Sequence, residues 1–499
     1  MTKLTKERLT ILAPEEAVSL LTKLEKLLQQ RNIDCYVVGG FIRDALMGRP
    51  NSDIDVVVAG EATSIASDIA RAFSARIVPL DDVNQVSRVI LSQAGGDWHL
   101  DFTTMRGSIE EDLRHRDFTI NAIAVNLAEI RNERSRVRII DPLDGQHDLS
   151  SRTIRAASEA SFQRDPARLI RAVRFAATLD FSIEPSTEAL IQRDHKLVTT
   201  VAPERLRDEL YYILETPRAY HSFRYLDRLG LLDPLMPELT MAKGVTQPKE
   251  HFWDVFDHSL ETVATVERLL RQQRGEQEDA FLNSVPWTPD IAQHFAQQIA
   301  GGRTRGALLK LAGLLHDIGK PITKTIEQSG KMRFLGHPQE GTAMVVQLMK
   351  RLRFSNREIK MVQLMTEHHM RPGYLVGEEM PTHRAIYRYF RATAEVGIDT
   401  LFLGLADHLA ARGPTLDPDE WRKHTETVQY MLDKWFQEQT TVVPIKLIDG
   451  HTLIDELGLA PGPQIGELLE VVREAQAAGE IETAEEALEL VTKRLGRNQ

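Results

Sequence analysis

The sequence predicts an α+β protein in which a region of mixed strands and helices precedes a long helical region. Between about residues 31 and 145, short apolar runs rich in β-branched residues alternate with helical stretches, which is typical of a mixed sheet. From about residue 150 onward, nearly every apolar pattern has the helical period. A chain of 499 residues is long enough for two to four domains, each with its own core.

The elements follow in chain order. A helix over 1–30 leads into strands predicted at 35–38, 53–58, 86–92, 98–104 and 137–141, with helices at 41–47, 62–73 and 117–123. In the helical region, glycine and proline residues mark the breaks, and the polar stretch 273–287 is predicted to be a loop. The predicted domains are a head (1–148), a helical neck (149–245), a third domain (246–430) and a C-terminal module (431–499).

Composition excludes several classes of protein. Hydrophobic residues make up 42% and charged residues 27%, as in ordinary soluble proteins, and no apolar run approaches the roughly 20 residues of a membrane span. Cys35 is the single cysteine, which excludes an internal disulfide framework. A cytoplasmic protein with no membrane partner is expected, and the sequence does not indicate an oligomeric state. The net charge of −11 argues against a general nucleic-acid coat but leaves room for a local basic groove.

The first predicted strand ends at Gly39-Gly40, and a second strand carries Asp53 and Asp55. Two glycines let the backbone turn sharply and expose N–H groups that can bind phosphate, next to a helix N-terminus. Side chains two apart on a strand share a face, so Asp53 and Asp55 project together. Although an isolated Asp-x-Asp is usually a surface turn, paired carboxylates beside a phosphate-binding turn suit metal-assisted nucleotidyl transfer.

Three further segments strengthen this hypothesis. Asp101 lies on a predicted strand and could add a third carboxylate, although a solvated strand residue is the alternative. Arg116 can neutralise a triphosphate, while Asp117 and Asn121 are spaced i and i+4 on the predicted helix 117–123 and suit ribose hydroxyls, although an N-capped helix would have the same pattern. The third segment has three arginines at three-residue spacing after an aspartate, which can offer an acceptor and donors to a base edge or can simply be a solvated face. Its charged residues are Asp165, Arg168, Arg171 and Arg174.

Together these motifs resemble the class II tRNA nucleotidyltransferase and poly(A) polymerase family in its HD-domain-bearing form. The matching segments are Gly39-Gly40-x-x-Arg43-Asp44, Asp53-x-Asp55, 114–124, 141–145, 165–174 and 203–209. The resemblance implies a polymerase-β-like head in which Asp53 and Asp55 bind Mg²⁺ and a tRNA 3′-hydroxyl attacks the α-phosphate of ATP or CTP, releasing pyrophosphate. It implies nucleotide contacts by Gly39, Gly40, Arg43, Asp44, Arg116, Asp117, Asn121, Asp165, Arg168, Arg171 and Arg174, with Asp165 and Arg168 selecting the base.

Two departures from the family pattern leave the added nucleotides open. Arg164 stands where the family usually has a glutamate that orients the base-selecting arginine. The connector Gly107–Leu113 is shorter than the loop of members that add all of C-C-A, and it resembles the CC-adding subtype. Addition of CCA, of CC, of A or of poly(A) therefore all remain alternatives.

A second constellation lies in the third domain, where His316-Asp317 precedes a glycine at a predicted helix end. Imidazole and carboxylate ligands on separate helices suit Mn²⁺, Fe, Ni²⁺, Co²⁺ or Mg²⁺. The order of these residues resembles the HD phosphohydrolase superfamily, which implies His258, His316, Asp317 and Asp407 as ligands of one metal and His337 and His368 as ligands of a second. His369 and His251 are expected to be structural histidines.

The alternatives for the whole chain differ in which constellation acts. One is an HD phosphohydrolase whose head only binds a nucleotide, and another is an RNA-binding protein without catalysis. Within the transferase hypothesis, the HD domain could merely position tRNA. The C-terminal segment 450–469 resembles the tail of HD-bearing nucleotidyltransferases, which implies contacts with the tRNA body.

Overall fold

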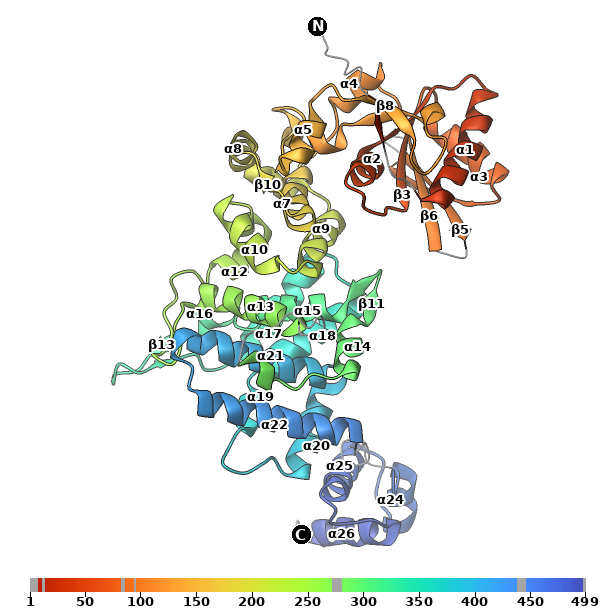
Figure 1. Cartoon of the computed structure of the whole chain (residues 1–499). Helices are drawn as coiled ribbons and strands as arrows, with labels where there is room; N and C mark the ends of the chain where they lie inside the picture. The colour runs from red at the N-terminus through yellow and green to blue at the C-terminus, as the bar shows by residue number, and fades with distance from the viewer. Residues whose placement is uncertain are drawn as a thin grey trace. The chain divides into compact units, whose positions relative to one another are not determined.

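The structure, a computed structural model, describes residues 8–10, 14–81, 86–93, 96–271, 281–437 and 446–496 (Figure 1). The chain divides into two compact units, one of residues 1–201 with 229–231 and the other of 202–228 with 232–499. The predicted division into four domains stays a prediction. Among the described helices, none combines the length and the apolar character needed to cross a membrane.

The first unit is built on a mixed sheet of eight strands, which confirms the predicted α+β class. The strand order is β1-β8-β7-β2-β3-β6-β5-β4, and β3 pairs with β6 in parallel while every other neighbouring pair is antiparallel. The strands are β1 (Arg8–Thr10), β2 (Cys35–Val38), β3 (Asp53–Val58), β4 (Arg76–Asp81), β5 (Val86–Gln93), β6 (Gly96–Thr104), β7 (Ala124–Asn126) and β8 (Arg136–Ile140). All five predicted strands are present, and β1, β4 and β7 were not predicted.

The two faces of this sheet bury different clusters. On one face, Ile54 and Phe102 pack in a large core with residues of α1 (Glu15–Gln29) and α3 (Ala62–Ala72). On the other face, Val57 packs in a smaller cluster with Leu113 of α4 (Ile109–Leu113). Because side chains alternate along β3, Asp53 and Asp55 lie on the same face as Val57, away from the large core.

The predicted helix over 117–123 is wrong. The segment forms only a 3₁₀ turn, η1 (Thr119–Asn121), and the chain then enters β7. The Asp117 carboxylate accepts a hydrogen bond of 2.8 Å from the backbone N–H of Phe118, so the side chain stabilises a tight turn before η1. The predicted helix over 1–30 is shorter as well, since α1 begins at Glu15 and β1 precedes it.

A short helix, α5 (Gly145–Ser150), packs against η1. The Asp141 carboxylate accepts hydrogen bonds from the backbone N–H groups of Gly145 (2.7 Å) and Gln146 (2.9 Å), which caps this helix. Buried Asp148 accepts a hydrogen bond of 2.6 Å from the Thr119 hydroxyl and so fixes α5 to η1. A Cβ atom at position 145 would lie 2.2 Å from the Thr119 carbonyl oxygen, so only glycine fits there.

Gly145→Ala should therefore destabilise the first unit by about 2–3 kcal/mol, the upper part of the range for overpacking of a tight contact. Calorimetric unfolding of the full chain should show a transition at lower temperature. Gly466→Ala is the matched control, because Gly466 also lies in a helix, α25 (Pro463–Ala477), and a Cβ there meets nothing within 4 Å. A Gly145→Ala midpoint equal to that of the natural chain would contradict the predicted clash.

The rest of the described chain is mainly helical, as predicted. The first unit ends with α6 (Ser161–Arg164), α7 (Arg168–Leu179), α8 (Pro185–Asp194), η3 (His195–Thr200) and the strands β9 (Thr153–Ile154) and β10 (Ser182–Ile183). The main helices of the second unit are α9 (Pro203–Glu215), α10 (Ala219–Arg228), α13 (Val255–Arg271), α14 (Pro289–Ala296), α15 (Arg305–Leu315), α17 (His337–Arg351), α18 (Asn356–His368), α20 (His383–Thr393), α21 (Gly397–Arg412), α22 (Pro418–Gln437), α24 (Gly450–Leu457), α25 and α26 (Ala484–Gly496). Short elements between them are α11 (Leu232–Leu235), α12 (Pro237–Thr240), η5 (Leu282–Ser284), α16 (Lys320–Thr323), α19 (Arg371–Leu375), η6 (Ala394–Val396), η7 (Gly413–Thr415) and the strand pairs β11 (Gln298–Ala300) with β12 (Arg303–Thr304) and β13 (Thr325–Ile326) with β14 (Met332–Arg333). Of the predicted loop 273–287, residues 273–280 lie outside the described part of the chain.

The second unit contains a buried ion pair between helices and a separate C-terminal core. Asp399 of α21 accepts a hydrogen bond of 2.7 Å from Arg305 at the start of α15, and both side chains are buried. Residues 446–496 have a hydrophobic cluster of their own, which includes Leu453, Leu468 and Val491. This C-terminal module therefore does not depend on the rest of the unit for its core.

Candidate active site and metal centre

Three carboxylates lie on adjacent strands of the first unit. In the parallel pair of β3 and β6, Asp55 is aligned with Asp101 and Asp53 with His99. Each carboxylate has its own partner: the Gly40 backbone N–H donates to Asp55 (3.3 Å), and Arg88 donates twice to Asp101 (2.7 Å each). The structure therefore places the third predicted carboxylate beside Asp55, as expected.

The two glycines form the turn that the sequence predicts. Gly39 has a φ of 69°, in the left-handed region, and begins helix α2 (Gly39–Leu46). A Cβ atom at position 39 would lie 2.6 Å from Asp55 Oδ2, so a larger residue would collide with the carboxylate. The N-terminus of α2 therefore reaches the carboxylates only because glycine stands there.

The electrostatics of Asp55 favour a bound cation. Burial raises the pKa of this carboxyl, the nearby Arg116 opposes that rise, and the negative charge of Asp101 adds to it. A divalent cation would relieve both the burial and the repulsion between the carboxylates. The donor set consists of carboxylate oxygens, which are the ligands that Mg²⁺ takes, so the residues present fit that ion.

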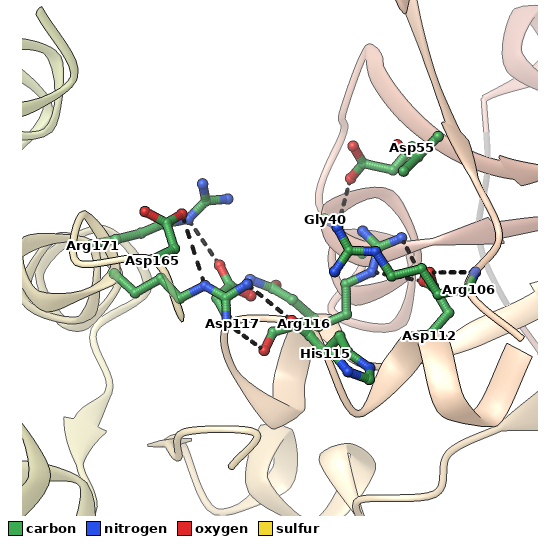
Figure 2. A pocket seen from close by; sticks show the side chains of 13 residues that line it. Gly40, Asp55, Arg106, Asp112, His115, Arg116, Asp117, Asp165 and Arg171 are labelled. Atoms are coloured by element: carbon green, nitrogen blue, oxygen red, sulfur yellow. Dashed lines mark hydrogen bonds and ion pairs between the residues drawn. The ribbon is translucent and has the colours of Figure 1, made fainter. Parts of the chain in front are cut away.

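A cavity of about 240 Å³ opens next to these groups. Figure 2 shows Gly40 and Asp55 on one side of it, Asp165 and Arg171 on the other, and Arg116 with Asp117 between them. Its lining residues are Gly39, Gly40, Asp55, Thr103, Arg106, Asp112, His115, Arg116, Asp117, Asn121, Asp165, Arg168 and Arg171. Nine residues of the predicted nucleotide and metal set are thus brought to one cavity.

Arg116 is held by Asp112, which the sequence motifs do not identify. Asp112 is buried, and its Oδ2 accepts a hydrogen bond of 3.2 Å from Arg116 while its Oδ1 accepts one of 3.3 Å from the Arg106 backbone N–H. Asp112 lies on α4, whose start is fixed by a capping box between Ser108 and Glu111. The Ser-x-x-Glu spacing in the short connector is the signal that could have revealed this helix.

A connected row of polar groups runs along the floor of the cavity. Arg171 Nε lies 2.9 Å from Asp117 Oδ2, and Asn121 donates a hydrogen bond of 3.1 Å to Asp117 Oδ1. Burial alone would raise the pKa of Asp117, but the guanidinium groups of Arg171 and Arg168 outweigh it and lower the pKa. Asp117 is therefore held as a carboxylate.

Arg43 and Asp44 lie outside the lining of this cavity, and their predicted nucleotide contacts stay a prediction. Arg43 donates to the neighbouring Asp44 (2.9 and 2.8 Å) and to Asn121 Oδ1 (2.8 Å), and Asn51 donates to Asp44 (2.7 Å). Both residues are buried and neither lines the cavity. They orient Asn121, and through it Asp117, from behind the cavity wall.

The predicted base-selecting residues join the neck to the head. Asp165 precedes α7 in extended conformation, and Arg168 begins that helix. Arg168 donates to the backbone carbonyls of Arg116 (3.0 Å) and His115 (2.9 Å), so part of its guanidinium is used to fix the cavity wall. Arg174 does not line the cavity, because its guanidinium lies over the Phe175 ring at 4.1 Å.

The second unit gathers two groups of candidate metal ligands. One consists of His258, His316 and Asp407, with His258 Nε2 3.0 Å from Asp407 Oδ1 and 3.2 Å from His316 Nε2. The other consists of Asp317, His337 and His369, with Asp317 Oδ1 3.4 Å from His337 Nε2 and 3.6 Å from His369 Nε2.

Asp317 belongs to both groups by its contacts. Its Oδ2 lies 3.3 Å from His258 Nε2 and 3.2 Å from His316 Nε2, while its Oδ1 faces His337 and His369. The ammonium group of Lys320 also lies 2.6 Å from Oδ2. One carboxylate therefore stands between the two groups, in the arrangement of a bridging ligand.

In the structure, His369 and not the predicted ligand His368 lies in this cluster. Helix α18 buries the residues that precede both positions at helical spacing: Val362, Met365 and Thr366 precede residue 369, and Met361, Leu364 and Met365 precede residue 368. His369 is 2% exposed and lies in the cluster, whereas a structural role was expected for it. The helical period of the preceding residues therefore does not distinguish the two histidines, and only the folded geometry does.

Three of the four clustered histidines are oriented for metal binding. Their Nδ1 atoms lie within hydrogen-bond distance of backbone carbonyl oxygens: His316 with Gly313 (2.9 Å), His337 with Phe334 (2.8 Å) and His369 with Thr366 (2.7 Å). Because a carbonyl oxygen only accepts, Nδ1 carries the proton and the Nε2 lone pair is left facing the cluster. Converging lone pairs and carboxylates in a buried site fit a metal ion.

Comparisons with known proteins agree with both sites. Family models match as a poly A polymerase head domain at 35–155, a probable RNA- and SrmB-binding site of polymerase A at 180–243 and an HD domain at 255–412. An A-adding tRNA nucleotidyltransferase of Deinococcus radiodurans is 33% identical over 92% of this chain and 94% of its own length. A CC-adding tRNA nucleotidyltransferase of Thermus thermophilus is 29% identical over 91% of this chain and 92% of its own length.

A solved structure shares the fold. The Thermotoga maritima CCA-adding enzyme complexed with tRNA aligns over 97% of this chain and 96% of its own chain, with a TM-score of 0.59 and 24% identity. The head match spans the strand carboxylates and the glycine turn, and the HD match spans both groups of candidate metal ligands. The chain therefore belongs to the tRNA nucleotidyltransferase family.

Proposed function

We propose that this chain adds CMP, AMP or both to the 3′ end of tRNA without a nucleic-acid template. The observation that carries the proposal is the meeting of Asp55, the Gly39-Gly40 turn and Arg116 at one cavity, next to Asp53 and Asp101 on the neighbouring strands. Nucleophilic attack by the tRNA 3′-oxygen on the α-phosphate forms the new phosphodiester bond. The bond to the β-phosphate breaks, and pyrophosphate leaves.

Each part of the cavity has a role in this reaction. The positive end of helix α2, brought close by the glycine turn, attracts the phosphate oxygens, and Arg116, oriented by Asp112, balances the triphosphate charge. Asp117 accepts hydrogen bonds from the ribose hydroxyl groups, and Asn121 donates a hydrogen bond to the ribose. Asp165 and the donors of Arg168 that are not used on the backbone select the base.

Asp53 and Asp55 would hold Mg²⁺, with Asp101 close enough to share its charge. When bound, this ion lowers the barrier by stabilising negative charge on the phosphate and by favouring the ionised 3′-hydroxyl. The chain's own contribution is to keep both carboxylates on one strand face beside the phosphate-binding turn. Because Arg88 neutralises Asp101 in place, Asp53 and Asp55 are the more available ligands.

The connector favours a narrower proposal, that the enzyme adds only part of C-C-A. Residues 107–113 form a glycine turn and the capped helix α4, and a Cβ at Gly107 would lie 1.9 Å from Glu111 Oε2. This segment positions Arg116 through Asp112 and leaves no long loop beside the cavity. Arg164, with its guanidinium 3.4 Å from the Ser158 hydroxyl, provides no carboxylate to orient Arg168.

The test uses three tRNA transcripts, ending at position 73, at C74 and at C75, each incubated with CTP alone, ATP alone or both. Partial addition predicts either two C residues on the first transcript and no A, or a single A on the third transcript and no C. Addition of C-C-A to the first transcript would refute the narrower proposal and keep the broader one. Long A tracts would indicate a poly(A) polymerase. No incorporation with any combination of transcript and nucleotide would refute both the broader and the narrower proposal.

We propose a second activity, hydrolysis of a phosphate ester at the HD centre. The observation that favours it is the bridging position of Asp317 between two buried ligand groups. His258, His316 and Asp407 would hold one metal and His337 and His369 another, each shared with Asp317, and Mn²⁺, Fe, Ni²⁺, Co²⁺ or Mg²⁺ suits these donors. Bound ions would supply an activated water molecule, and Lys320 offers a cation for the phosphate.

The domain roles follow from these assignments. We assign 1–148 to nucleotidyl transfer, 149–245 to base selection and RNA binding, and 246–430 to the HD centre. We assign 431–499, of which 446–496 form the module with its own core, to contact with the tRNA body. Truncation after residue 437 should weaken tRNA binding without changing nucleotide binding.

A further inference from the structure

The Asp53 carboxylate has a histidine as its hydrogen-bond partner. The Nδ1 atom of His99 lies 2.6 Å from Asp53 Oδ1. The carboxylate can only accept, so the imidazole donates from Nδ1. This is the shortest of the hydrogen bonds to the three strand carboxylates, next to 2.7 Å for Arg88 to Asp101 and 3.3 Å for Gly40 to Asp55.

The strand pairing fixes His99 in this place. His99 lies directly opposite Asp53 in the parallel pair, and its backbone N–H donates to the carbonyl of Ser52 (3.0 Å). On β6, His99 and Asp101 share a face, so the histidine is carried by the strand that also carries the third carboxylate. The backbone therefore sets the imidazole beside Asp53 before any ligand binds.

Asp53 needs such a partner more than Asp55 does. The Asp53 side chain is 60% exposed, while the His99 side chain is 28% exposed and more firmly held by its neighbours. Asp53 is the first residue of β3, and its backbone N–H is bonded to the Asn51 side chain, so the carboxylate is free to rotate unless it is held. Asp55, in contrast, is partly buried and accepts a hydrogen bond from the Gly40 backbone N–H.

We propose that His99 is a positioning residue that fixes the Asp53 carboxylate for cation binding. The hydrogen bond to Oδ1 sets the plane of the carboxylate and leaves Oδ2 outside that bond. Partners of metal ligands typically change metal affinity or activity by about 10–100-fold when they are removed. Arg88 holds and neutralises Asp101 instead, so strands β5 and β6 provide a partner for each of two carboxylates but prepare only Asp53 for the cation. The inference rests on the proposed transferase function, because it concerns the same carboxylates.

The test compares His99→Leu with His99→Asn in the full chain. The Asn side-chain amide nitrogen occupies nearly the position of Nδ1 and can donate to Oδ1, whereas Leu cannot. His147→Leu is the control, since His147 is an exposed histidine of the same unit that lies outside the cavity wall. His99→Ala is a second truncation, to be used if the Leu variant loses its near-UV circular dichroism.

Two readouts are measured. The first is Mn²⁺ binding, measured by electron paramagnetic resonance without tRNA or nucleotide, which reports on the carboxylates directly. The Mn²⁺ binding that is lost in Asp53→Ala is the share that belongs to the head and not to the HD centre. The Mg²⁺ concentration for half-maximal incorporation is the second readout. For His99→Leu, the affinity of the Asp53-dependent share should fall about tenfold and the half-maximal Mg²⁺ concentration should rise by a similar factor. His99→Asn should stay within about twofold of the natural chain.

The proposal is overturned if His99→Leu binds Mn²⁺ as the natural chain does, if it binds more tightly, or if the Asn and Leu variants lose affinity equally. The last result would mean that the imidazole acts by packing and not by its hydrogen bond. Failure of the transferase proposal has a different signature. The natural chain would then incorporate no nucleotide, while the Mn²⁺ readout would still test His99.

Discussion

Asp53→Ala should lower nucleotide incorporation into tRNA by about 10³-fold or more. A bound metal ion stabilises transition-state charge by several kcal/mol, and each 1.36 kcal/mol corresponds to a factor of ten. Removing the carboxylate leaves the glycine turn and Arg116 in place, so nucleotide binding should change far less than the rate. The measurement is single-turnover incorporation of labelled CMP or AMP at saturating nucleotide, together with a separate nucleotide-binding titration.

His316→Ala is the control for this prediction. It removes a ligand of the HD centre, which contributes no residue to the transferase cavity, and should leave incorporation within about twofold of the natural rate. Asp55→Ala should match Asp53→Ala in rate. If Asp53→Ala kept its rate, the two-carboxylate mechanism would be wrong. If His316→Ala lost as much, the two centres would have to be coupled.

Periodicity predicted the sheet of the first unit well, and its failures have local causes. The edge strand β4 (Arg76–Asp81) was missed because it contains Pro79, which is tolerated at a sheet edge but argues against a strand in the sequence. The segment 117–123 has helix-like apolar spacing, but Asp117 bonds to the Phe118 backbone and the chain then joins the sheet. A pairing between distant strands overrode the local pattern.

The site residues that escaped prediction share one feature. Motifs identified the residues that face the ligand, such as Asp55 and Arg116, because the chemistry requires those residue types. The residues that hold them, such as Asp112, Arg88 and His99, are visible only once strand register and side-chain geometry are known. In the other direction, motif position alone placed Arg43 in the nucleotide contacts, whereas geometry gives it the task of holding Asn121.

The adjacent histidines at the end of α18 give a sharp test of the HD centre. His369→Ala should lower the content of bound transition metal and cut hydrolysis of a phosphodiester such as bis(p-nitrophenyl) phosphate by about 10–100-fold. The reason is that His369 Nε2 lies 3.6 Å from Asp317 and 3.4 Å from His337 Nε2, at the centre of the second ligand group.

His368→Ala is the matched control, since the same change one residue earlier on the helix should leave metal content and hydrolysis unchanged. Metal is measured by elemental analysis after reconstitution with Mn²⁺, and hydrolysis by release of p-nitrophenol before and after chelation. Equal losses in both variants would mean that the end of α18, and not the His369 imidazole, matters. Full metal loading with no hydrolysis in the natural chain would leave a metal site that supports structure, and would refute the phosphohydrolase proposal. Loss only in His368→Ala would restore the family-based assignment, because the cluster geometry predicts the opposite order.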